Sequence, residues 1–164
     1  MGVGIKGLQR VQKRLEEINK FDKKTRELLV KIANVAKNEI TLAFENEKSP
    51  FGKDWNELED STKKQKEKLG YGDKKKLYRE GDLTARWVIV PKGNNAVRLV
   101  SSAKSGLNFA YGLVHQYGTN KAGRKRNTKI KARPFLPINK DKISEPLKKA
   151  IQKVKREILK SSKR

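Results

Sequence analysis

The spacing of apolar residues changes along the chain, and this change is the strongest constraint on the fold. The first apolar residues recur three or four positions apart, which places them on one face of a helix: Ile5, Leu8, Val11, Leu15 and Ile18. A similar run begins near Asp22, a good N-cap residue, and continues to about Phe44. Its apolar face is formed by Leu29, Ile32, Ala36, Ile40 and Ala43. The pattern predicts two helices that pack together or cover a sheet.

The middle of the chain has a different pattern, which is typical of strands. Trp87 to Val90 and Ala96 to Val100 are rich in β-formers and flank a turn, so they predict a β-hairpin. The apolar stretch 109–117 is too short to distinguish a strand from a single-turn helix. Residues 119–129 hold Gly and Asn among basic residues without an acid, which predicts a mobile basic loop, and 130–138 returns to extended character.

Two further helices complete the pattern. Thr62 and Gln65 can form a capping box that opens a short, exposed helix ending near Leu69. A last helix starts at Ser144 and tolerates Pro146 in its first turn. Its inward residues are Leu147, Ile151, Val154 and Ile158.

These elements predict an α+β fold, with two N-terminal helices and a C-terminal helix packed on a small, mostly antiparallel sheet that includes the hairpin. The length favours a single domain over residues 1–164. Its expected parts are a helical segment 1–46, a polar linker with a short helix 47–85, a sheet region 86–138 that contains the basic loop 119–129, and a C-terminal helix in 139–164.

Charge limits the classes of partner. The chain has 41 Lys and Arg against 18 Asp and Glu, a formal net charge of +23, while hydrophobic residues make up only 35%. Such a charge attracts polyanions whatever the fold, because neutralising phosphates releases counterions. The absence of Cys excludes disulfides and Cys-ligated metals. We expect no membrane span, since no apolar run approaches the length that one requires.

The supply of catalytic groups is small. His115 is the only histidine, so any His-based acid–base chemistry would depend on it alone, and a hydrogen-bonded structural role is the favoured interpretation. Four carboxylates cluster at Asp54, Glu57, Glu59 and Asp60, where they could bind Mg²⁺ or, as we favour, balance nearby lysines. The sequence therefore predicts no catalytic residue, no cofactor and no metal site.

Two kinds of binding surface remain open. Phosphates could be bound by the basic residues of the loop and its flank, although these could equally form a solvated face: Lys121, Arg124, Lys125, Arg126, Lys129 and Lys131. Large aromatic side chains near loops suit a protein interface, with core packing as the alternative that we favour for Trp87; they are Trp55, Trp87, Tyr111, Tyr117 and Phe135.

Four short blocks carry a family resemblance. The first is S-P-F-G-K-D-W-N-E-L at 49–58 followed by Ser61-Thr62, and the second is the turn Leu77 to Leu83. The third is Y-G-L-V-H-Q-Y-G at 111–118, and the fourth is A-R-P-F-L at 132–136. In this order and spacing the blocks resemble the phage virion-morphogenesis family, which includes tail-completion and Mu-like G proteins of tailed phages and prophages.

The resemblance implies a non-enzymatic structural protein of the phage neck or upper tail, needed for tail completion or for head-tail joining. It implies other neck or tail proteins as partners, a homo-oligomeric ring in the virion, and the bacterial host cytoplasm as the place of assembly, with DNA contact by the basic surface as a further expectation. The residues expected to shape the central sheet and its adjoining loop are Tyr111, His115, Gln116, Tyr117, Gly118, Arg133, Pro134 and Phe135, with Trp55 as an interface anchor.

Two other classes of function remain as alternatives. The first is a small nucleic-acid-binding protein whose basic loop and C-terminal helix contact phosphates nonspecifically. The second is an enzyme that depends on His115.

Overall fold

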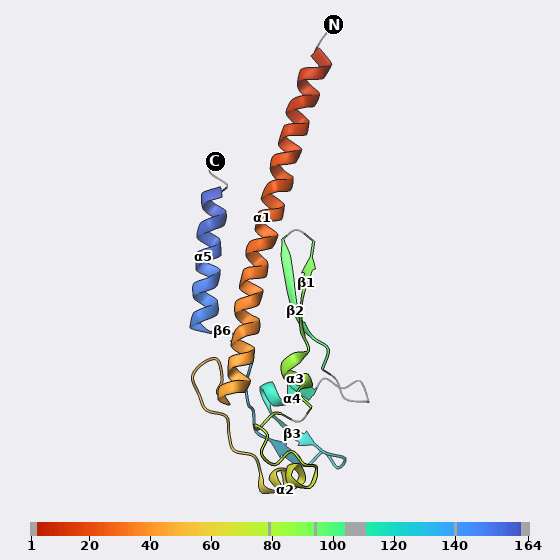
Figure 1. Cartoon of the computed structure of the whole chain (residues 1–164), viewed down its shortest axis with the longest axis vertical. Coiled ribbons are helices and arrows are strands. Elements are labelled where there is room, and N and C mark those ends of the chain that lie inside the picture. Colours follow the sequence, from red (N-terminus) through yellow and green to blue (C-terminus); the bar gives the residue numbers. More distant parts are fainter. Residues whose placement is uncertain (1–2, 79, 94, 104–110, 140, 162–164) are drawn as a thin grey trace.

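A computed structural model describes residues 3–78, 80–93, 95–103, 111–139 and 141–161. Its longest element is a single helix, α1 (Val3–Asn46), of 44 residues. At 1.5 Å per residue this helix is about 66 Å long. Its C-terminal half lies against the rest of the protein, whereas its N-terminal part extends beyond every other labelled element (Figure 1).

The expectation of two N-terminal helices was wrong, because the two apolar runs belong to one helix. Ile18 and Leu29 are eleven residues apart, close to three full turns, so both runs lie on the same face. Neither Gly nor Pro occurs between them, and Asp22 therefore continues the helix instead of capping a new one.

The other elements confirm the α+β class. The strands of the described residues form three separate antiparallel pairs in place of one central sheet. Along the chain the elements are α2 (Asp60–Lys68), α3 (Asp82–Ala85), β1 (Trp87–Lys92), β2 (Ala96–Ser101), α4 (Tyr111–Tyr117), β3 (Thr119–Ala122), β4 (Thr128–Ile130), β5 (Ile138–Asn139), β6 (Lys142–Ile143) and α5 (Glu145–Ser161).

The β1–β2 hairpin is confirmed, with Trp87 opposite Ser101 and Lys92 opposite Ala96. Trp87 is buried, and its indole Nε1–H donates to the carbonyl oxygen of Leu83 at 2.8 Å. Its core role, the favoured interpretation, is thus confirmed. The hairpin lies beside α1 in Figure 1 and packs against it.

The expectation of a mobile loop at 119–129 was wrong, because β3 and β4 pair as an antiparallel hairpin. Gly123 (φ +78°) and Arg126 (φ +52°) take the left-handed conformations of the turn between them. The strands have four and three residues, which is too short for an alternating pattern to be recognised in the sequence.

The helix boundaries show which local signals were informative. α2 begins at Asp60 behind Glu59, without a side-chain cap, so the capping box expected at Thr62 was wrong. Of the stretch 109–117, which the sequence left open, residues 111–117 form a helix, α4, and residues 109–110 lie outside the described part of the chain. α5 begins as expected, since the Lys148 N–H donates to the carbonyl oxygen of Ser144. No helix in the described part of the chain is long and apolar enough to cross a membrane.

The core lies at the C-terminal end of α1, where Phe44, Trp55, Trp87 and Phe135 belong to one buried cluster. Phe44 contacts Trp55 edge-on at 5.3 Å between ring centroids and Phe135 at 5.1 Å, while Trp87 lies 6.2 Å from Phe135. Phe135 is only 2% exposed. It therefore joins α1, the β1–β2 hairpin and the segment that follows β4 into one cluster.

The contact between α1 and α5 contains a buried carboxylate. Glu39 of α1 is 7% exposed, and its Oε1 has no hydrogen-bond partner among the described residues. Burial raises the pKa of Glu39, while interactions with the Ser144 side chain and the Leu147 backbone lower it by less. The ionised form is therefore less stable in the folded protein than in the unfolded chain.

We expect Phe135→Ala to lower the free energy of unfolding by about 3–5 kcal/mol, because the cavity removes packing against the rings of Phe44 and Trp87. Urea unfolding followed by tryptophan fluorescence measures the change. Tyr117→Ala is a suitable control because Tyr117 is 57% exposed. A Phe135→Ala protein as stable as this control would contradict the packing described above.

Glu39→Gln tests the buried carboxylate through the pH dependence of stability. Because the folded pKa of Glu39 is raised above 4.5, its contribution is fully present below that pH and is lost as pH rises through the folded value. The stability of Glu39→Gln relative to the native protein should therefore increase from pH 4 to pH 7. A difference in unfolding free energy that does not change over this range would contradict the raised pKa.

Candidate functional site

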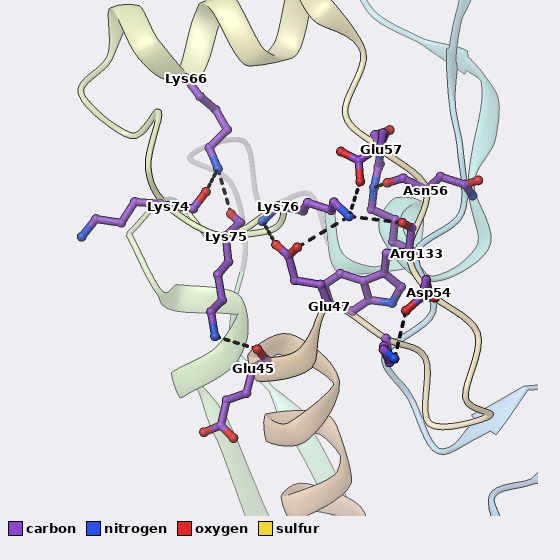
Figure 2. A network of polar contacts seen from close by, with 12 residues as sticks. Glu45, Glu47, Asp54, Asn56, Glu57, Lys66, Lys74, Lys75, Lys76 and Arg133 are labelled. Carbon is purple, nitrogen blue, oxygen red and sulfur yellow. Dashed lines mark hydrogen bonds and ion pairs between the residues drawn. The ribbon is translucent and has the colours of Figure 1, made fainter.

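The residues of the four sequence blocks meet around the segment 131–137, which lies outside the helices and strands. Arg133 is 5% exposed and holds this segment to residues 56 and 57. Its Nε donates to the carbonyl oxygen of Asn56 at 2.8 Å, and its Nη2 donates to that of Glu57 at 2.6 Å (Figure 2). The Trp55 indole N–H donates to the Pro134 carbonyl at 2.7 Å. Two segments without regular structure are thus joined by side-chain donors.

Gln116 fixes α4 to the other side of the same segment. It is 1% exposed, and its Oε1 accepts the backbone N–H groups of Phe135 at 2.9 Å and Leu136 at 3.0 Å. The Arg133 N–H donates to the His115 carbonyl oxygen at 2.7 Å. Buried backbone N–H groups require hydrogen-bond acceptors, which a neighbouring strand provides in a sheet. Here the side-chain oxygen of Gln116 is the acceptor instead.

Gly118 ends α4 at a point of close backbone approach. Its φ of +73° is left-handed, and an added Cβ would lie 2.9 Å from both the Ala132 nitrogen and the Ile130 oxygen. Only glycine avoids both the unfavourable conformation and the collision with backbone atoms that cannot move away.

His115 is largely buried beside Arg133. Burial lowers its pKa, and the positive charge of Arg133 lowers it further, so the imidazole is neutral at pH 7. Its ring lies 6.5 Å from that of Tyr111, and nothing in the described part of the chain pairs with its Nδ1. The hydrogen-bonded role expected of the histidine side chain therefore stays a prediction, because the hydrogen bond from Arg133 reaches the backbone carbonyl of His115 and not its ring.

The acidic cluster is paired with lysines. Asp54 lies 3.3 Å from Lys48, Glu57 2.7 Å from Lys76, Glu59 3.0 Å from Lys131 and Asp60 3.9 Å from Lys63. Hydrogen bonds from Lys76 and Lys131 lower the pKa values of Glu57 and Glu59. No group of three or more potential metal ligands occurs in the parts of the chain that the structure covers. The arrangement agrees with the interpretation that these acids balance lysines.

Sequence reasoning missed the structural role of the lysine run at 74–76. The Lys76 ammonium contacts Glu57 and Glu47 and donates to the Trp55 carbonyl, and its pKa is raised chiefly by the hydrogen bond to Glu57 (Figure 2). Lys66 donates to the carbonyls of residues 74 and 75, and Lys75 donates to that of Glu45. A run of lysines resembles a solvated face, so no sequence signal separated these from exposed ones.

The predicted binding residues divide into buried and exposed groups. Trp55, Arg133 and Phe135 are buried within the protomer, whereas Tyr117 is exposed. Lys131 pairs with Glu59. The basic residues left exposed on the β3–β4 hairpin are Lys121, Arg124, Lys125, Arg126 and Lys129. The predicted binding residues that a partner could reach therefore lie on this hairpin and, at Tyr117, on α4.

Gly118→Ala should destabilise the protein by at least about 2 kcal/mol, because it adds a backbone collision to an unfavourable φ. Gly52→Ala is the matched control, since Gly52 has a φ of +83° but no atom within 4 Å of an added Cβ. Thermal and urea unfolding of both variants would separate the cost of the left-handed φ, which both glycines have, from the cost of the backbone collision, which only Gly118 has. Equal decreases in stability would show that the close approach to Ile130 and Ala132 has no energetic consequence.

Comparisons with known proteins identify the family of the chain. The model of the phage virion morphogenesis family matches residues 6–160. Mu-like prophage FluMu G protein 1 of Haemophilus influenzae is 32% identical over 120 residues, which cover 73% of each chain. No solved structure matches. With its four sequence blocks joined in one cluster, the chain belongs to the phage virion morphogenesis family and has a structural role in phage assembly.

Proposed function

We propose that the protein completes the tail or joins it to the DNA-filled head, as a non-catalytic subunit of the virion neck or upper tail. The proposal rests on one observation: within the four sequence blocks, the side chains of Arg133, Gln116 and Trp55 form hydrogen bonds with the chain's own backbone. His115 has a lowered pKa and no partner at Nδ1 among the described residues. The chemistry of this cluster supports a rigid scaffold, which suits an assembly part.

In this proposal several copies form a ring with other neck or tail proteins as neighbours, after assembly in the bacterial host cytoplasm. Support comes from exposed apolar side chains near the cluster, since such groups favour subunit interfaces. Leu113 and Tyr117 of α4 are 58% and 57% exposed. Tyr117, Tyr111 and the β3–β4 hairpin would then contribute to the interfaces with neighbouring subunits.

The basic hairpin supports DNA contact as part of this function, and nonspecific nucleic-acid binding as the second candidate function. Its five exposed Lys and Arg residues occur between positions 121 and 129 without an acid. A two-stranded ribbon of this kind can follow phosphates without reading sequence. In a neck, such a hairpin would meet DNA that passes from head to tail.

Deletion of the gene from its phage or prophage tests the assembly role. We expect electron micrographs to show unjoined heads and tails or tails of abnormal length, with recovery when the native gene is supplied. Normal infectious particles from the deletion would overturn the proposal, whatever DNA affinity the protein has.

Replacing Lys121, Arg124, Lys125, Arg126 and Lys129 with Gln tests the hairpin. If these residues bind phosphates, DNA affinity falls and the slope of log K against log salt becomes shallower by about 0.9 for each phosphate that the variant no longer neutralises. A matched control removes five exposed basic residues of α1, at Lys13, Lys20, Lys23, Lys24 and Lys31. Equal decreases in affinity for both variants would show that overall charge, and not the hairpin, governs DNA binding.

A further inference from the structure

The N-terminal part of α1 carries an apolar seam that the rest of the described protein leaves uncovered. Val11, Leu15 and Ile18 are 57%, 55% and 51% exposed. Figure 1 shows this part of the helix projecting beyond α5 and the β1–β2 hairpin. Apolar side chains that line up on one face of an uncovered helix are a candidate surface for a partner.

The spacing of the seam distinguishes it from the buried half of the helix. Its positions alternate by four and three residues, as in a heptad with a single a/d stripe: Val11, Leu15, Ile18, Asp22, Thr25, Leu29 and Ile32. In the C-terminal half the apolar surface is wider and includes the buried Leu28, Ala33, Ile40 and Phe44. A narrow stripe suits one partner helix, whereas the wide one suits a core with neighbours on several sides.

We propose that two copies of this chain pair through the seam, with their α1 helices antiparallel and Leu15 of each opposite the second copy's Ile18. In this register Asp22 lies opposite Val11 and within reach of Arg14, so the acid meets a base. A parallel pair would instead place Asp22 against Asp22 at a seam position, where two like charges are costly. Charge therefore favours the antiparallel arrangement.

The flanking residues and the shape of the protein agree with this pairing. The positions beside the seam hold Gln12, Arg14, Asn19 and Phe21, so the register brings Arg14 next to the second copy's Phe21 and Gln12 next to Asn19. Since α5 and the hairpin lie along the C-terminal half of α1, an antiparallel pair keeps the two bodies at opposite ends (Figure 1).

This pairing does not depend on the proposed function. Because all copies in a polar ring point the same way, the pair would separate before entering one.

Sedimentation equilibrium over a range of concentrations tests the pairing. We expect a concentration-dependent species at twice the 18.8 kDa of the chain. The double variant Leu15→Ala/Ile18→Ala should remain helical, because Ala favours helices, and should be monomeric. Lys13→Ala/Lys20→Ala changes the opposite face of the same helix and should still pair. A native protein that is monomeric at every concentration, or pairing that survives the removal of the Leu15 and Ile18 side chains, would overturn the proposal.

Spin-label distances test the direction of the helices. The chain has no Cys, so Lys13→Cys and Glu27→Cys each supply one label site per copy. The antiparallel register places the two Glu27 sites about 30 Å apart or more and the two Lys13 sites much closer. A parallel pair would give two similar distances of under about 20 Å, which would contradict the proposed register.

Discussion

The segment 131–137 pairs with no strand among the described residues, and the hydrogen bonds that buried side chains make with it hold the core together. Arg133 binds carbonyl oxygens from residues 56 and 57, while Gln116 accepts N–H groups from Phe135 and Leu136. Without these bonds, buried backbone groups would lose water without gaining a partner. They bring Phe135 into contact with Phe44 and Trp87, so the core depends on them.

This constraint explains why polar and aromatic residues recur together in the four sequence blocks. Trp55 supplies both a ring for the core and a donor for the Pro134 carbonyl. Gly118 permits the close approach between the end of α4 and residues 130–132. The hydrogen bonds and close contacts around the segment 131–137 therefore fix the positions of α4 and of the end of the β3–β4 hairpin. A function in assembly would use the surfaces that the cluster positions, while the block residues themselves remain inside.

The sequence pattern predicted the elements whose formation depends on residues close together in the chain. The β1–β2 hairpin and α5 follow from β-propensity and from a helix start at Ser144. The two-helix expectation for 1–46 was wrong because Asp22, although a good N-cap residue, lies inside one helix whose apolar face continues from Ile18 to Leu29. The β3–β4 hairpin was missed because its strands are very short. The resemblance to a family identified the site residues, but their roles depend on hydrogen bonds between residues 18 to 79 positions apart in sequence, which no local pattern encodes.

Amide hydrogen exchange of the native protein tests most directly whether side chains hold the irregular segment in place. We expect the amides of Arg133, Phe135 and Leu136 to exchange about as slowly as those of the buried half of α1, because each donates a hydrogen bond to a residue of α4. The exposed turn of the β3–β4 hairpin should exchange much faster. Exchange at 133–136 as fast as in that turn would show that Gln116 and Arg133 do not secure the segment, and would contradict the account.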